Sequence, residues 1–192
     1  MKSALWAKTL LTSYRYLEHI AGAIDKLVDS EAMNSYYYQP ETKVNGVVEV
    51  SDRIISLIER KKRMINTKVL VDMALEKCNS VFAGLLRGKY FYHESCENLA
   101  TKFNFPMRTF FRKMTQAEFQ LAFEIEKLGF TDEKLHSLHS EEVWMNEIYD
   151  KFAKGDEESI FRKPTDEEVA EEMRRRPLKD YRQKPERQRQ VC

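Results

Sequence analysis

Apolar side chains recur every three or four residues through the N-terminal part of this 192-residue chain. Because an α-helix turns once in about 3.6 residues, this spacing places them on one helical face. The residues at this spacing are Leu10, Tyr14, Leu17, Ile24 and Leu27/Val28, with Leu11 and Ile20 beside them. We therefore predict one long amphipathic helix from about Ala4 to Tyr38.

A break between Gln39 and Val48 precedes a second predicted long helix. Pro40 restricts its neighbour, and Asn45-Gly46 is a strong turn signal. Ser51 is a candidate N-cap for the helix that follows. The apolar stripe of this helix consists of Ile54, Leu57/Ile58, Ile65, Val69 and Met73, and extends toward Val81/Phe82. Two long helices joined by one loop are expected to pair as an antiparallel hairpin.

The helical spacing of apolar residues favours an all-α protein, and composition favours one that is soluble, cytoplasmic and not associated with membranes. Hydrophobic residues make up 42% of the chain and charged residues 33%, and no apolar run approaches the roughly 18 residues that span a bilayer. The three cysteines are widely spaced and odd in number, which argues against disulfides and against a structural zinc site. We expect neither a cofactor nor a metal.

The segment from Ala83 to Phe130 predicts three consecutive helices, over about Ser80–Phe91, Cys96–Phe103 and Pro106–Leu128. Asn104 tolerates the left-handed conformation that a sharp turn between helices needs. Pro106 suits a first helical turn, and Gly129 suits a C-cap. In the third helix the expected buried stripe is Phe110, Met114, Ala117, Leu121, Ile125 and Leu128.

The outer face of the third helix carries side chains that can recognise DNA. Arginine and glutamine match guanine and adenine edges, methionine and threonine can meet a thymine methyl, and lysine suits phosphate. The preceding helices add basic residues that could hold the phosphate backbone. The expected DNA-binding residues are Arg87, Lys89, Lys102, Met107, Arg108, Thr109, Arg112, Lys113 and Gln116.

Residues Leu85–Leu121 resemble the promoter-reading helix-turn-helix domain of bacterial sigma factors. The matching positions are Leu99-Ala100, Phe103, Thr109-Phe110, Met114 and Ala117. The resemblance implies a helix-turn-helix, double-stranded DNA as a partner and RNA polymerase as a further candidate partner. The N-terminal half shows no match to the polymerase-binding domain of a sigma factor. A sigma-like transcription regulator of a bacterium or phage is therefore the expected function.

The predicted organisation has four parts. They are a helical hairpin over 1–82, the sigma-like helix-turn-helix over 83–130, a C-terminal helical extension over 131–155 and a charged flexible tail over 156–192. The tail is acidic up to Glu172 and basic from Arg174 onward, with few apolar residues. The hairpin could form a homodimer or contact another factor.

Other functions have weaker signals in the sequence. His136 and His139 could share a helix face and bind a metal, but no third ligand is evident. No nucleophile paired with a base and no phosphate-binding glycine loop occurs, so we do not expect an enzyme. The alternatives to a DNA-binding regulator are a helical interaction or scaffold protein that does not bind DNA, and a divergent sigma factor acting with RNA polymerase.

Overall fold

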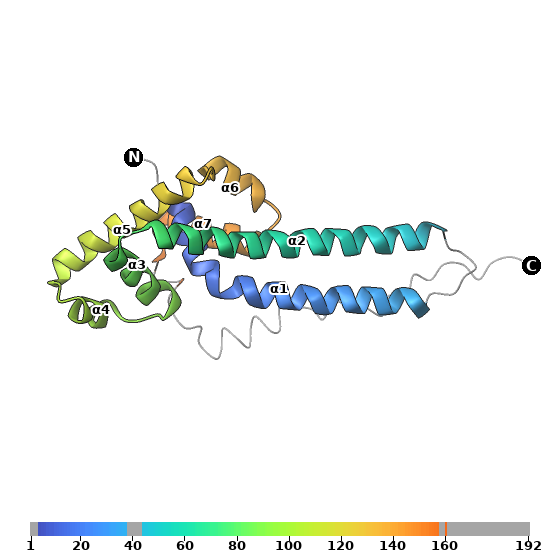
Figure 1. Cartoon of the computed structure of the whole chain (residues 1–192), viewed down its shortest axis with the longest axis horizontal. Helices are drawn as coiled ribbons and strands as arrows, with labels where there is room; N and C mark the ends of the chain where they lie inside the picture. The colour runs from blue at the N-terminus through green and yellow to red at the C-terminus, as the bar shows by residue number, and fades with distance from the viewer. Residues whose placement is uncertain (1–3, 38–43, 158–159, 161–192) are drawn as a thin grey trace, which may run out of the picture. The chain divides into compact units, whose positions relative to one another are not determined.

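A computed structural model describes residues 4–37, 44–157 and 160, and every regular element among them is a helix (Figure 1). No strand occurs in this part of the chain, which confirms the all-α fold class. Residues 1–157 form one compact unit, which is the subject of the following description. The predicted tail lies almost wholly outside the described residues.

Two long helices, α1 (Leu5–Tyr37) and α2 (Val44–Lys77), lie side by side (Figure 1). Polar contacts between them run in opposite chain directions, as in an antiparallel pair. Lys61 Nζ is 2.5 Å from Asp25 Oδ1, Lys68 Nζ is 2.7 Å from Glu18 Oε2, and Tyr14 donates a 2.7 Å hydrogen bond to Asp72. On α1 the predicted residues Leu10, Leu11, Leu17 and Ile24 are all buried.

Helix α2 begins at Val44, earlier than the sequence pattern predicts. Asn45-Gly46 therefore lies in the first helical turn instead of a loop, and Ser51 is an interior residue instead of the N-cap. The first backbone N–H groups of any helix have no partner within it. Residues with weak helix propensity consequently cost less there than in the middle of a helix.

The apolar stripe predicted for α2 is not the one that the protein buries. Ile58, Ile65, Val69 and Met73 are each 39–48% exposed. The buried residues of α2 are instead Met64, Thr67, Leu70, Val71, Ala74 and Leu75, and Cys78, directly after its last residue, is buried as well. Several of these are small or weakly apolar, so their stripe is less evident in the sequence. Periodicity predicts that a helix has an apolar face but does not identify which of two faces meets a neighbour.

Shorter helices complete the unit, and α5 packs against α1, α2, α3 and α4, while α7 packs against α1. They are α3 (Ser80–Leu86), the π-helical turn η2 (Arg87–Phe91), α4 (Cys96–Lys102), α5 (Met107–Lys127), α6 (Asp132–Leu138) and α7 (Val143–Lys154). Within the described ranges no helix has both the length and the apolar content needed to cross a membrane.

A buried ionic cluster fixes the middle of α5 against its neighbours. Glu118 is 4% exposed and accepts a 2.7 Å hydrogen bond from Tyr90 of η2. Lys8 Nζ of α1 lies 3.4 Å from Glu118 and 2.6 Å from Glu157, while Lys89 Nζ lies 3.6 Å from Glu118. Burial favours the neutral form of Lys8, but the hydrogen bond to Glu157 and the two carboxylate charges outweigh it and raise the Lys8 pKa.

Candidate nucleic-acid interface

The connection between α4 and α5 is a tight turn built around Asn104. Asn104 has φ = 54°, the left-handed conformation predicted for it. Phe105 N–H donates to the Ala100 carbonyl at 2.8 Å and Asn104 N–H donates to the Thr101 carbonyl at 3.0 Å. Pro106 occupies the N-cap position, one residue before the helix and not within its first turn. The chain thus leaves α4 and enters α5 through very few residues.

Two glycines allow α3 and η2 to approach α4 closely. A Cβ atom on Gly88 would lie 2.4 Å from Leu99 Cδ2, and one on Gly84 would lie 2.9 Å from Phe103 Cζ. Such separations are impossible for carbon atoms without movement of the neighbour. Ala100 of α4, another small residue, is also buried. The close approach itself is made by Gly84 of α3 and Gly88 of η2, which face α4.

The face of α5 that packs inward agrees with the predicted stripe. Phe110, Met114, Ala117, Leu121 and Ile125 are all buried, and the last predicted member, Leu128, is partly buried. Gly129, directly after the C-cap residue, has φ = 86°. The helix is therefore anchored along its whole length, and its opposite face is presented to solvent.

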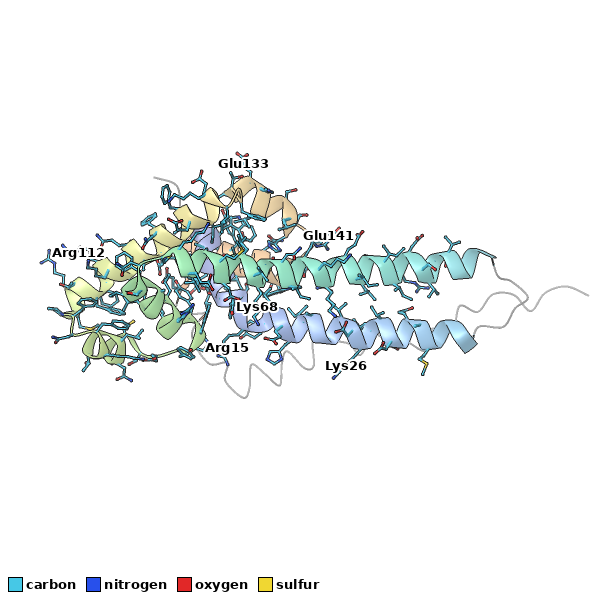
Figure 2. All side chains as sticks on the ribbon, in the orientation of Figure 1. Arg15, Lys26, Lys68, Arg112, Glu133 and Glu141 are labelled. Carbon is cyan, nitrogen blue, oxygen red and sulfur yellow. The ribbon has the colours of Figure 1, made fainter. Side chains whose placement is uncertain are left out.

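Arg108, Thr109 and Arg112 come together at the N-terminal end of α5, where they line an open hollow of about 520 Å³. Arg108 and Arg112 are exposed, and neither has an ion pair with any residue that the structure describes. Figure 2 shows Arg112 directed away from the neighbouring helices. Gln116 is exposed as well and lies four residues after Arg112, on the same side of the helix. These side chains form a polar, cationic strip on α5.

Other predicted contact residues border this strip. Met107 is 39% exposed at the start of α5. Lys113 is partly exposed, and its Nζ lies 5.5 Å from the ring centre of Phe82 in α3. Lys102 at the end of α4 is exposed and lies 3.0 Å from the Glu94 carboxylate. The two lysines carry the charge that attracts an anionic ligand, although Lys102 would exchange an existing ionic partner for it.

Lys89 and Arg87 are not brought to the strip. The Lys89 side chain is only 18% exposed and takes part in the buried cluster with Glu118 and Glu157. Arg87 is exposed on η2, near Tyr14 of α1, and its charge opposes the rise of the Tyr14 pKa.

His93, which could also have held phosphate, is poorly suited to do so. Burial, and then the nearby charge of Arg15, lower its pKa below the ordinary value of about 6.5. The ring is consequently neutral at pH 7. It lacks the positive charge that attracts a phosphate group.

Phe111 is an exposed aromatic on this end of α5 that sequence analysis did not select as a contact. It is 53% exposed, and its ring meets that of Phe110 edge to face at 5.5 Å between centroids. Phe111 lies about 100° around α5 from Phe110 and therefore outside the buried stripe that Phe110 shares with Met114 and Ala117. Its place outside this stripe is the sequence signal that could have identified it as an exposed aromatic.

The two histidines considered as metal ligands pack around Trp6 instead. His139 is fully buried, with its ring centroid 5.8 Å from that of Trp6, and His136 lies 6.0 Å from Trp6. Thr67 Oγ1 is 3.3 Å from His139 Nε2. No group of three or more potential metal ligands gathers anywhere in the described ranges.

No protein-family model matches the chain, and no curated protein or solved structure is significantly similar to it. The resemblance of residues 85–121 to a sigma-factor domain accordingly stays a prediction. Any function has to be argued from the geometry around α4 and α5.

Proposed function

We propose that the protein binds double-stranded DNA by inserting the N-terminal half of α5 into a major groove, with α4, the Asn104 turn and α5 acting as a helix-turn-helix. The observation that supports this most directly is the polar, cationic strip of Arg108, Thr109, Arg112 and Gln116 on α5, which begins just after the Asn104 turn. In a helix-turn-helix the start of the second helix contacts the bases. The strip occupies that position.

The dimensions and chemistry of α5 suit this role. An α-helix with its side chains is about 10–12 Å across, and the major groove of B-DNA is about 12 Å wide. Arg108 and Arg112 can each donate two hydrogen bonds to a guanine, and Gln116 can do the same for an adenine. Since no side chain caps the start of α5, its first backbone N–H groups are available to a phosphate. Lys102 and Lys113 would add contacts to the backbone.

A regulator of transcription is the cellular role that we propose for this DNA-binding unit. The sigma-like sequence pattern over residues 85–121 supports it, and it makes RNA polymerase a candidate second partner. Helices α1 and α2 make up most of the N-terminal part that the structure describes, and the sequence offers no polymerase-binding signature there. We therefore propose that the protein regulates transcription and does not initiate it by itself.

Selection of bound duplexes from a random genomic-fragment pool, at about 150 mM salt, tests the proposal. We expect the wild-type chain to enrich a sequence motif and the Arg112→Ala variant to lose about 1–3 kcal/mol of binding to that motif. Lys26→Ala is the matched control, because Lys26 is an exposed cation on α1, away from α5 (Figure 2). It should bind like the wild type.

Failure of the wild-type chain to enrich any motif would contradict the proposal. Equal losses in Arg112→Ala and Lys26→Ala would also contradict it, because they would indicate nonspecific attraction of phosphate to any surface cation. Either result would favour the interaction-protein alternative.

A further inference from the structure

Phe111 and Met107 form an apolar edge on the N-terminal half of α5, beside the polar, cationic strip. Phe111 is 53% exposed and Met107 is 39% exposed, and residues four apart lie on the same side of a helix. Consecutive residues are about 100° apart around a helix, so Phe111 lies about 60° from Arg108. The apolar edge and the strip therefore face neighbouring directions, and a ligand that lies along this end of α5 meets both.

The exposed ring of Phe111 is supported by the core. Its centroid lies 5.5 Å from that of Phe110, edge to face, and Phe110 is fully buried. Aromatic pairs of this geometry are favourable beyond their apolar burial. This contact restricts the Phe111 side chain before any ligand arrives, so less conformational entropy is lost when its open side is covered.

In a major groove, an apolar side chain has one kind of apolar partner among the base edges. The edges present hydrogen-bond donors and acceptors, and only thymine adds an apolar group, the methyl on C5. A G·C pair opposite the Phe111 ring would instead lose the water around its polar atoms without gaining a hydrogen bond, which is unfavourable. The ring therefore discriminates between base pairs although it forms no hydrogen bond.

We propose that Phe111, together with Met107, selects a thymine in the target sequence by packing against its 5-methyl group. This inference rests on the proposed function and makes it more specific. At about 1.5 Å per residue, the Cα atom of Phe111 lies within about 5 Å of those of Arg108 and Arg112 along the helix axis. Base pairs follow one another every 3.4 Å or so. The thymine consequently lies within about two base pairs of a guanine that these arginines contact.

Replacement of single thymines by uracil, in the duplex that the wild-type chain enriches, tests the proposal. Deoxyuridine pairs with adenine as thymidine does and lacks only the 5-methyl group. We expect one thymine at which this replacement weakens wild-type binding about fourfold, the effect of leaving one methyl group unburied. Binding titrations at about 150 mM salt measure the change.

Variants of the chain assign the effect to Phe111. Phe111→Ala should bind the thymine and uracil duplexes equally, and its retained binding of the uracil duplex shows that it is folded. Phe123→Ala is the matched control, because Phe123 is 54% exposed further along the same helix. Thr109→Ser removes a methyl group about 160° around α5 from Phe111. Both of these variants should keep the wild-type preference for thymine.

The outcomes separate this inference from the proposed function. A motif with no thymine near its guanines, or equal wild-type affinity for thymine and uracil at every position, would overturn the inference while DNA binding stands. A Phe111→Ala variant that still prefers thymine would show that another residue contacts the methyl group, and would overturn the role of Phe111. A wild-type chain that enriches no motif would overturn the inference and the proposed function together.

Discussion

Both carboxylate oxygens of Glu142 accept hydrogen bonds from the guanidinium of Arg60, at 2.8 and 2.7 Å, although 82 residues separate the two. Glu142 is 1% exposed and also accepts a 3.1 Å hydrogen bond from Trp144 Nε1. Burial alone would raise the Glu142 pKa, but these hydrogen bonds and the positive charges of Arg60 and Arg63 lower it. The pair joins the start of α7 to the middle of α2.

Replacing Glu142 by glutamine should therefore destabilise the protein. The variant removes the charge of a buried bidentate pair, and we expect a loss of about 1–3 kcal/mol in the free energy of unfolding. Glu141→Gln is a matched control, because Glu141 is 76% exposed where it contacts Arg63. Urea unfolding should show a change below about 1 kcal/mol for Glu141→Gln. Equal effects of the two variants would contradict this interpretation.

His139 should make stability depend on pH between about 4 and 6.5. Burial lowers its pKa to about 4, partly opposed by the charge of Glu142 and assisted by that of Arg63. In the unfolded chain the pKa is near 6.5, so between these values the unfolded state binds the additional proton. Stability is complete above about pH 6.5 and falls as the pH decreases toward 4.

Urea unfolding at pH 7 and pH 5 measures this effect. We expect wild-type stability to fall by about 2 kcal/mol more than that of His139→Gln over this interval. Glu142 does not account for the difference, because its pKa is lowered and its contribution is lost only at more acidic pH. An identical pH dependence in both proteins would exclude His139 as its source.

Gly88→Ala should displace α4 from η2. The added methyl group meets Leu99 at 2.4 Å, so we expect about 1–3 kcal/mol of destabilisation. Gly22→Ala is the control, because nothing lies within 4 Å of its Cβ position in α1, and it should stabilise the helix by about 0.5–1 kcal/mol. Thermal unfolding should shift in opposite directions for the two variants. A neutral Gly88→Ala would mean that the helices are not in this close contact.

Tyr90→Phe tests the buried ionic cluster. The variant keeps the ring but leaves one Glu118 oxygen without its 2.7 Å donor, which should cost about 1–3 kcal/mol of stability. The control is Tyr92→Phe, because Tyr92 is 69% exposed. Chemical denaturation should leave Tyr92→Phe within about 0.5 kcal/mol of wild type. A similarly small effect of Tyr90→Phe would show that the lysines alone satisfy Glu118.

Local signals in the sequence were sufficient to predict the helices and the turn at Asn104. Apolar spacing gave the buried face of α5, and the tolerance of asparagine for positive φ gave the turn. These features depend only on residues a few positions apart. They could therefore be predicted without knowing what any helix packs against.

The features that sequence analysis missed depend on contacts between distant segments. The choice of face on α2 is decided by what α1 and the α6–α7 connection present to it. Lys89 turns inward because Glu118 and Glu157, far along the chain, provide its ionic partners. At the candidate interface, Arg108 and Arg112 lie on the exposed face of α5, as the apolar spacing of that helix predicts. Lys89 instead lies in the interior. A single sequence does not show these distant partners.

The Lys8–Glu157 contact, across 149 residues, has a consequence for the order in which the protein is made. During synthesis Lys8 leaves the ribosome long before Glu157 exists. Tyr149 of α7, whose ring packs against that of Trp6 in α1, is also translated late. Until α7 has been made, part of the apolar surface of α1 therefore stays exposed to solvent. A chain with exposed apolar surface is prone to aggregate or to need a chaperone. Folding of the whole unit can finish only after its last helix has emerged.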